Sequence, residues 1–530
     1  MIKKTSLFVV GMISVCVTAS VFANETTAAK LPPIISLLFD DPKIPKDELA
    51  DINKDGVLNI LLLGSSKSIQ RYSSFSNTGA HPFSTQSTAE ELQNILLADP
   101  EISVGVYVES EDIYTSKQVA TGVGQGGSAN NLTYHRHSLM QYYYWPEGLD
   151  NRNQNLSGNN AKDWDYVVIA ADPYIVATTP GYYSLGVDKI ASKVAEGNAK
   201  PLLLMMWPKQ PIEGVSIDHF EEFTYRASDG AKVEISTVPA GLAWKNLSAQ
   251  QQATGSTHPT ANGAYVAAAS IYSHIFDQSA ATSDYEYNNA IAYIALSTIK
   301  QEANKQHYSG TSNFISPFMA CNIDDMQLNY THTGSSSENG IRAGLNWVFS
   351  KSDATLVRNG TPPVNFNYGR ANSNFEANKR YKIDASKSNF SFGFPMQDNS
   401  IGGIGDISMQ YGLDKRSSFT ENDTDLGTAS FMIKNAELPL ARAVPIRTLL
   451  VQMKEVIPGH PAYSDSWHMH RNLDKAVGGY MYTLLTGDCA LGTQPSDQTS
   501  AAWKTWMSHK IGYETAWKVM TMKTAPECGT

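Results

Sequence analysis

The sequence is short of cysteine and of charged residues, and it has no long apolar run beyond its N-terminus. Four of the 530 residues are cysteine, and 17% are Asp, Glu, Lys or Arg. No cysteine has the close Cys or His neighbours of a zinc site. The lack of a later apolar run argues against a membrane-spanning protein. The 42% of hydrophobic residues instead fit a folded chain with a sizeable core and two or three domains.

Basic residues are also scarce relative to acidic ones. The chain has 41 Lys and Arg against 51 Asp and Glu, which gives a net charge of −10. Non-specific nucleic-acid binding needs a basic surface, so no nucleic-acid partner is expected. An anionic substrate is still allowed, because local groups of cations decide its binding. We expect no cofactor and no metal, and the sequence leaves a homo-oligomer open.

The N-terminus has the pattern of a bacterial secretory signal peptide over residues 1–23. Lys3 and Lys4 give a basic start, an apolar stretch follows, and small residues mark a cleavage site after Ala23. We therefore expect a secreted or periplasmic protein, with an uncleaved membrane anchor as the alternative. Cleavage would remove both lysines and shift the net charge to −12.

Cleavage would also remove one of the cysteines, Cys16. It would leave Cys321, Cys489 and Cys528, and an exported protein can form disulfides. Three thiols allow three pairings, and the sequence does not choose among them. A bond between Cys489 and Cys528 would tie down the C-terminus.

Strands and helices alternate regularly between residues 51 and 280. Short apolar runs such as 58–63 are typical of strands buried on both faces, and helical periodicity separates them. This alternation predicts a doubly wound parallel sheet with helices on both faces. A lead-in segment precedes the domain at 24–50. Residues 51–56, which join the two, have a partial calcium-loop pattern that we interpret as a tight turn.

The composition changes over residues 281–530. This region begins with a helical pattern, becomes rich in Asn, Ser and Gly with scattered aromatic residues, and ends in further helical segments. We expect an accessory, substrate-binding α+β region. No internal repeat at a fixed period is visible.

Gly64-Ser65-Ser66 follows the first apolar run directly. Glycine permits a tight turn from strand to helix, and a hydroxyl at that point would be exposed at the strand end. Ligands of open α/β sheets bind beyond the carboxyl ends of the strands. A serine there becomes a nucleophile only when a base accepts its proton. The alternative is a polar turn that closes a buried strand.

Two later segments carry the groups that such a serine needs. His258 precedes Pro259, so it lies in a loop or at a helix start, where it could act as a base. The glycine-rich stretch 122–137 could offer backbone N–H groups to a developing negative charge, and Asn131 could add an amide. A structural histidine and a flexible loop are the alternatives.

Together these segments resemble three sequence blocks of the SGNH (GDSL-like) hydrolases: residues 60–68 the first block, the glycine-rich stretch the second, and the segment around His258 the last. The resemblance covers residues 56–280 and implies an SGNH/flavodoxin-like doubly wound fold. It implies that Ser66 is the nucleophile and His258 the base. It also implies that the Gly127 N–H, with Asn131 beside it, stabilises the oxyanion.

The chain departs from that family at two positions. The family has Gly-x-Asn-Asp after the middle strand, and here Asp172 is only a loose substitute. The family also has an aspartate three residues before the histidine, where this chain has Gly255. Asp465 is a candidate to orient His258 instead. It belongs to an Asp-x-x-His sequence, so His468 is an alternative base; His468 and His470 could also bind a metal, although an isolated His-x-His is a weak signal.

Cations lie next to the predicted catalytic residues. Lys67 directly follows Ser66, and the second block leads into His135, Arg136 and His137. Lysine and arginine suit an anionic group such as sulfate, which arginine binds through two hydrogen bonds. We therefore assign these four residues to substrate binding. The alternative is that Lys67 points to solvent and residues 134–137 form a helix surface.

The chain as a whole resembles the iota-carrageenan sulfatases, a class of marine bacterial carbohydrate sulfatases. This resemblance implies hydrolysis of the galactose 4-sulfate ester of a sulfated algal galactan. Basic residues of the second region would line a groove for the polymer; they are Arg370, Lys379 and Arg380. Formylglycine sulfatases are excluded because no Cys/Ser-x-Pro-x-Arg motif occurs.

Two other functions remain open at this point. One is a carbohydrate esterase of the SGNH type that removes acetyl groups from a polysaccharide. The other is a polysaccharide-binding protein without activity on a degenerate hydrolase scaffold, which the missing Asp and Asn motivate.

Overall fold

The computed structural model describes the chain from residue 50 onwards, with gaps. The described residues are 50–65, 87–113, 115–121, 130–136, 138–143, 155–156, 162–208, 215–252, 259–285, 287–303, 305, 308, 318, 327–332, 365–370, 390–393, 407–409, 442–457, 471–489 and 491–528.

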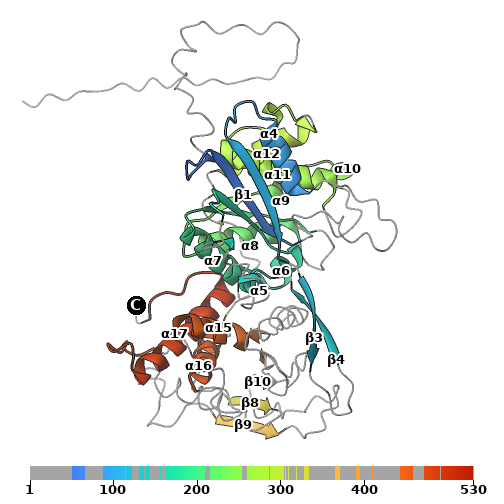
Figure 1. The fold of residues 1–530 in the computed structure, drawn as a ribbon. Helices are drawn as coiled ribbons and strands as arrows, with labels where there is room; N and C mark the ends of the chain where they lie inside the picture. The colour runs from blue at the N-terminus through green and yellow to red at the C-terminus, as the bar shows by residue number, and fades with distance from the viewer. Residues whose placement is uncertain are drawn as a thin grey trace, which may run out of the picture. The chain divides into compact units, whose positions relative to one another are not determined.

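A five-stranded parallel sheet forms the centre of the first half (Figure 1). Its strand order is β2-β1-β5-β6-β7, and every described pairing within it is parallel. Numbered within the sheet, this is the 2-1-3-4-5 order of flavodoxin-like doubly wound folds. The structure thus confirms the predicted fold class. The strands are β1 Val57–Gly64, β2 Gly105–Asp112, β5 Tyr166–Ala170, β6 Lys200–Leu204 and β7 Ser236–Val238.

The apolar runs of the sequence explain why these segments form the central strands. Leu58 and Ile60 to Leu63 of β1 are at most 1% exposed, and all five residues of β5 are buried. A strand covered by helices on both faces has no polar side, so it shows no alternation of apolar and polar residues.

Helices cover the sheet in two groups. In the first, α11 contacts α4 and α12; in the second, α7 contacts α5, α6 and α8. Ser87 and Glu90 form the capping box of α4 that their spacing predicts. The bounds are α4 Thr88–Leu97, α5 Leu139–Tyr143, α6 Pro173–Thr178, α7 Pro180–Glu196, α8 Ile217–Asp229, α9 Ala240–Lys245, α10 Ala249–Gln252, α11 Ala261–Phe276, the 3₁₀ turn η2 Ala280–Thr282 and α12 Asn289–Glu302.

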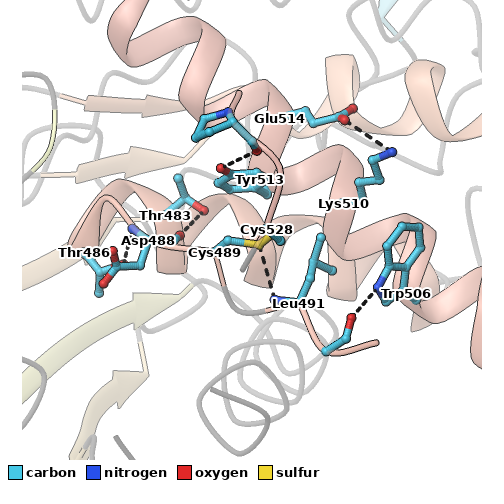
Figure 2. The surroundings of a disulfide bond; sticks show 12 residues. Thr483, Thr486, Asp488, Cys489, Leu491, Trp506, Lys510, Tyr513, Glu514 and Cys528 are labelled. Carbon is cyan, nitrogen blue, oxygen red and sulfur yellow. Dashed lines mark hydrogen bonds and ion pairs between the residues drawn. A yellow bond between two sulfur atoms is a disulfide. The ribbon is translucent and has the colours of Figure 1, made fainter. Parts of the chain in front are cut away.

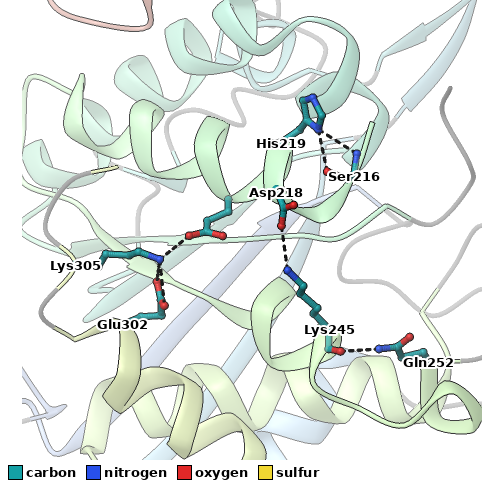
Figure 3. Close-up of polar contacts among 8 residues, drawn as sticks. Ser216, Asp218, His219, Lys245, Gln252, Glu302 and Lys305 are labelled. Carbon is teal, nitrogen blue, oxygen red and sulfur yellow. Dashed lines mark hydrogen bonds and ion pairs between the residues drawn. The ribbon is translucent and has the colours of Figure 1, made fainter. Parts of the chain in front are cut away.

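The core of this unit includes residues beyond 280. Ile291 and Ala295 of α12 are fully buried in the same core as the sheet. Lys305, just after α12, lies 2.5 Å from Glu221 of α8 and 3.0 Å from Glu302 of α12 (Figure 3). The helix after the predicted boundary is therefore packed on the α/β unit, while the boundaries themselves stay a prediction.

The turn at residues 51–56 lies at the amino edge of the sheet. The Asp51 carboxylate accepts hydrogen bonds from the N–H groups of Asp55 and Gly56, and Gly56 has a φ of +85°. Its acidic side chains thus cap their own backbone, which confirms the tight turn. The Asp165 carboxylate accepts from Ile52 and Asn59 nearby, and burial raises its pKa.

A two-stranded antiparallel hairpin follows β2. Its strands are β3 Thr115–Thr121 and β4 Asn130–Arg136, with Thr115 paired to Arg136 and Thr121 to Asn130. The structure corrects the interpretation of residues 134–137 as a helix surface, since residues 134–136 belong to β4.

The second half contains another five-stranded parallel sheet, in the order β12-β11-β10-β8-β9. Three of the described helices belong to the same half. The bounds are β8 Gln327–His332, β9 Asn365–Arg370, β10 Phe390–Gly393, β11 Ile407–Met409, β12 Arg442–Val444, α15 Ile446–Val456, α16 Arg471–Thr486 and α17 Ala501–Thr521.

The last helix, α17, packs on α7 of the first unit, which is the parallel sheet of β1, β2, β5, β6 and β7 with its covering helices up to α12. An added methyl group at Gly181 of α7 would lie 1.7 Å from the Val519 carbonyl oxygen, so only glycine fits at this crossing. The buried Lys518 ammonium donates to the Gly230 carbonyl, and Thr524 donates to the same oxygen at 3.0 Å. Among the described helices, none is long and apolar enough to cross a membrane.

A disulfide joins Cys489 and Cys528, which follow α16 and α17 (Figure 2). This is one of the three pairings that the sequence allows. Near it, the Tyr513 hydroxyl donates to the Pro526 carbonyl at 2.9 Å. The bond thus ties the C-terminal segment to the pair of helices that precede it.

Candidate functional site

The carboxyl edge of the first sheet has a topological switch point between β1 and β5. The chain leaves β1 for β2 on one side and then crosses to β5 on the other. In doubly wound sheets such a point leaves a crevice for ligands. Gly64 at the end of β1 pairs with Asp112 on one side and with Ala170 on the other.

Ser65 is the last described residue on the β1 side of the switch point. It is 1% exposed, and the Gly64 carbonyl before it accepts the Ile113 N–H at 2.8 Å. Ser66 and Lys67 lie outside the described residues. The structure therefore places Gly64 and Ser65 at the switch point, and the roles of Ser66 and Lys67 stay predictions.

Asp172 lies on the β5 side of the switch point. It comes two residues after Ala170, is 1% exposed, and accepts the Val176 N–H through its carbonyl at the start of α6. Ser66 likewise comes two residues after Gly64, the strand partner of Ala170. A buried carboxyl group thus lies at the strand end next to the predicted nucleophile turn.

The N-terminus of α11 reaches the same edge of the sheet. Thr260 caps this helix by accepting the Gly263 N–H at 3.1 Å. An added methyl group at Gly263 would lie 3.3 Å from the ring of Trp207, three residues past the end of β6. His258 lies outside the described residues, but it precedes Thr260 by two residues, or about 7 Å of chain.

The sequence did not single out Trp207, which is 1% exposed and stacks on Trp244 at 5.6 Å between ring centroids. Its signal is its position, because an aromatic residue just after an apolar strand falls at the carboxyl edge. Together with Gly263, it holds the start of α11 against this edge.

The hairpin separates the residues that the second block was predicted to bring together. Thr115 follows Asp112 within about 10 Å of chain, so the base of the hairpin lies near the carboxyl edge. Arg136 pairs with Thr115, and His135 with Ser116, at this base. Asn131 comes five residues before Arg136 in β4, so it lies about 17 Å from this base along the strand.

By this register, His135 and Arg136 lie nearer to the carboxyl edge of the sheet than Asn131 does. Gly127 and His137 lie outside the described residues. Their predicted roles in the oxyanion hole and in substrate binding therefore stay predictions.

A close Ser–His pair at the start of α8 has a structural role. The Ser216 hydroxyl lies 3.0 Å from Nδ1 of His219, and the same nitrogen accepts the Ser216 backbone N–H (Figure 3). The backbone bond occupies the lone pair that a catalytic base would need. The pair is the N-terminal cap of the helix.

The described part of the chain has no cluster of three or more His, Cys, Asp or Glu side chains that could hold a metal ion. Asp465, His468 and His470 lie outside it, as do Gly255, Lys379 and Arg380. Arg370 is the last residue of β9 in the second sheet. A role for these residues stays a prediction.

No protein-family model and no curated protein matches the chain. The solved structures that it resembles include a protein from Slackia heliotrinireducens, provisionally described as an SGNH hydrolase. That protein is 17% identical over 41% of this chain and 97% of its own, with a TM-score of 0.27. A DUF4886 family protein from Bacteroides uniformis ATCC 8492 is 11% identical over 48% of this chain and 97% of its own, with a TM-score of 0.28. Likenesses this weak carry no argument about activity.

Proposed function

We propose that this chain is an ester hydrolase with Ser66 as nucleophile and His258 as base. The observation that carries the proposal is the location of Gly64 and Ser65 at the switch point of a doubly wound sheet. The start of α11, three residues after His258, lies on the same edge. Described residues next to both predicted catalytic groups therefore lie at the same edge of the sheet, which supports the proposal.

The proposed substrate is a sulfate ester of a polysaccharide of the iota-carrageenan type. Lys67 is adjacent to Ser66, and Arg136 lies at the hairpin base near the end of β2. Cations at these positions favour an ester that is negatively charged at the reacting centre, because charge-assisted hydrogen bonds to sulfate oxygens are strong. A neutral acetyl ester offers them no charged partner.

The chemistry follows from these groups. The Ser66 hydroxyl passes its proton to His258 and attacks sulfur, while Lys67 and Arg136 hold the sulfate oxygens. The bond between sulfur and the sugar oxygen breaks, and His258 returns the proton to that oxygen. Water then releases sulfate from the serine by the same steps, and Gly127 N–H stabilises the charge that develops in each.

The proposed location is outside the cytoplasm, after cleavage at Ala23. The Cys489–Cys528 disulfide supports it, because such bonds persist in oxidising compartments. A polysaccharide is too large to be imported intact, so an enzyme acting on it has to be exported.

The test is to incubate the chain lacking residues 1–23 with iota-carrageenan and, separately, with acetylated xylan. Free sulfate and free acetate are measured by ion chromatography. We expect sulfate from the first substrate and no acetate from the second. Acetate without sulfate would replace the proposal with a carboxylic esterase. Binding to either polymer without any product would indicate a binding protein.

A further inference from the structure

Glu91 of α4 is a buried carboxylate without a cation beside it. It is 0% exposed, and among the described residues the charged group that acts on it is Glu90, which repels it. Glu222 of α8 is equally buried, but the Arg226 guanidinium lies 2.8 Å from it. Buried charges in proteins are paired or coordinate a metal ion. Glu91 therefore calls for a partner that neutralises it.

Polar groups of α11 and of the segment before α12 surround Glu91. Helix α11 packs against α4 (Figure 1). The Tyr285 hydroxyl donates to Oε2 of Glu91 at 2.8 Å, and the Tyr287 hydroxyl donates to Oδ1 of Asn262 at 3.3 Å. Burial raises the pKa of Tyr265 to about 12 and also raises that of Tyr287, and the Glu91 charge adds to both shifts. These hydroxyls therefore lie close to the carboxylate.

Three buried oxygens of this cluster have no hydrogen-bond partner among the described residues. They are Oε1 of Glu91, Oγ1 of Thr88 and Oη of Tyr265, and each belongs to a side chain at most 1% exposed. Thr88 lies one turn before Glu91 on the same face of α4. The Tyr265 ring is 6.3 Å from that of Tyr285, and the Asn288 N–H approaches its oxygen without forming a hydrogen bond. The three oxygens thus meet where α4 contacts α11.

We propose that Glu91, Thr88 and Tyr265 bind an alkali-metal cation, Na⁺ or K⁺, between α4 and α11. Hard cations take oxygen ligands. Ligand oxygens of a cation the size of Ca²⁺ lie about 2.3–2.6 Å from it, so two at right angles are about 3.3–3.7 Å apart. A hydrogen bond between oxygens spans about 2.5–3.0 Å. Oxygens grouped around a cation therefore need not bond to one another, as is the case here.

A monovalent ion fits the charge of this cluster. One carboxylate and two neutral hydroxyls carry a single negative charge, so Na⁺ or K⁺ leaves the cluster neutral, whereas Ca²⁺ would leave a buried positive charge. A proton would also neutralise Glu91, and burial raises its pKa. However, Oε2 accepts the Tyr285 hydroxyl, so the proton would make Oε1 a buried donor without a described acceptor, which is unfavourable.

The position of the cluster indicates what the cation does. Thr88 and Glu91 are the first and fourth residues of α4, and Tyr265 is the fifth residue of α11. Both helices begin at the carboxyl edge of the first sheet, because α4 follows β1 and α11 follows β7. A cation bound here fixes the starts of the two helices relative to each other. Its ligands come from separate segments, so no sequence motif marks the site.

The test follows thermal unfolding of the chain lacking residues 1–23 at pH 8 in choline chloride. Choline, which is too large for a buried site, is replaced stepwise by NaCl or by KCl at constant ionic strength. We expect the Tm to rise by at least about 3 °C with one of the two alkali ions and then to level off. The reason is that an ion bound by the folded state alone stabilises that state.

Variants of the ligands locate the effect. Glu91→Gln keeps the shape but removes the charge, and it should abolish the rise in Tm. Thr88→Val and Tyr265→Phe each remove one ligand oxygen and should raise the half-maximal cation concentration at least about 10-fold. Glu90→Gln is the matched control: it removes the charge of the exposed neighbour, and glutamine can keep the bond to the Ser87 N–H, so the rise should stay as in the wild type.

A crystal grown in rubidium chloride locates the ion directly. We expect an anomalous peak beside Oε1 of Glu91. This measurement uses the wild type, so it decides the matter even if Glu91→Gln does not fold; a crystal without a peak there overturns the inference.

The outcomes are independent of the proposed function. An equal rise in Tm for the wild type and Glu91→Gln would be a general salt effect and would overturn the cation site. Equal Tm values of the wild type in choline and in both alkali salts would overturn it too, and a proton would then neutralise Glu91. Absence of sulfate release together with an intact rise in Tm would contradict the proposed function and support the site.

Discussion

Lys518 is a buried cation between α17 and the first unit. Burial lowers its pKa to about 8 and Lys232 adds to this effect, whereas Asp188 opposes it. Between pH 8 and the ordinary lysine pKa near 10.5, the unfolded chain binds this proton and the folded chain does not. Stability therefore rises with pH across this window, and below it the folded protein carries the cost of a buried charge.

Lys518→Met should remove that cost. The Gly230 carbonyl keeps its bond from Thr524, so no acceptor is left unpaired. We expect the free energy of unfolding at pH 7 to rise by about 1–3 kcal/mol, since a pKa shift of one unit corresponds to about 1.4 kcal/mol. Urea denaturation at pH 7, 8, 9 and 10 measures it. A variant that is less stable at pH 7, with the same rise towards pH 10 as the wild type, would contradict this account.

Arg136 tests the predicted sulfate contact. Arg136→Ala should raise KM for the sulfated polymer about 10- to 100-fold, because a charge-assisted hydrogen bond to a buried partner is worth about 1.5–3 kcal/mol. Lys117→Ala, further along the same hairpin on β3, is the matched control and should leave KM unchanged. Initial rates over a range of polymer concentrations measure both. Equal effects of the two variants would show that general positive charge, and not this position, matters.

At the scale of elements, the crossing of α7 and α17 is the contact most sensitive to size. Gly181→Ala would normally favour a helix, by about 1 kcal/mol. The new methyl group would instead meet the Val519 carbonyl, so the helices must separate. We expect a net loss of about 1–3 kcal/mol, as in overpacked cores.

Gly492→Ala is the control for this substitution. A methyl group there meets nothing within 4 Å, so its effect should stay within about 0.5 kcal/mol. Thermal unfolding of the two variants side by side makes the comparison. If Gly181→Ala were as stable as Gly492→Ala, α17 would not pack on α7 as described.

The strands of the first sheet could be predicted from the sequence because burial on both faces leaves a continuous apolar run, as in residues 58–63. The hairpin over 115–136 could not, because its sequence is polar and Gly-rich and has no apolar face. The strands of the second sheet were missed for a related reason: β8 reads Gln-Leu-Asn-Tyr-Thr-His, without an apolar run.

The candidate site was predictable only in part. Gly64-Ser65 stands out because a polar turn directly follows an apolar strand. The start of α11 stands out through His258-Pro259. The distance of Asn131 from the hairpin base depends on the register of β3 and β4, and sequence spacing alone does not define a register when neither face is apolar.

At the scale of the whole molecule, the Cys489–Cys528 disulfide closes a loop of chain that contains α17. Cys489 and Cys528 are 39 residues apart, and closing a loop of this length restricts the unfolded chain by about 4 kcal/mol. The Cys489→Ser, Cys528→Ser double variant should lose about 2–4 kcal/mol of unfolding free energy. Urea denaturation with and without reductant checks this: reductant should destabilise the wild type and leave the variant unchanged. A reductant-insensitive wild type would contradict the pairing.

The packing of α17 on α7 links the two halves of the chain. Lys518 and Thr524 come from the last segment and bind Gly230 of the first unit, and the Ser184 hydroxyl lies 3.4 Å from the Met522 carbonyl. The C-terminal segment therefore shields part of the surface of α7 and α8 from solvent. We expect a chain cut before α17 to expose the surface around Gly181 and Gly230.

The central claim is that Ser66 cleaves an anionic ester. The most direct measurement is the initial rate of sulfate release from iota-carrageenan by the wild type, Ser66→Ala and the neighbouring control Ser68→Ala. We predict release by the wild type and the control, and a rate at least about 1,000-fold lower for Ser66→Ala, the range seen when a catalytic nucleophile is removed. Release by Ser66→Ala at the wild-type rate would contradict the claim.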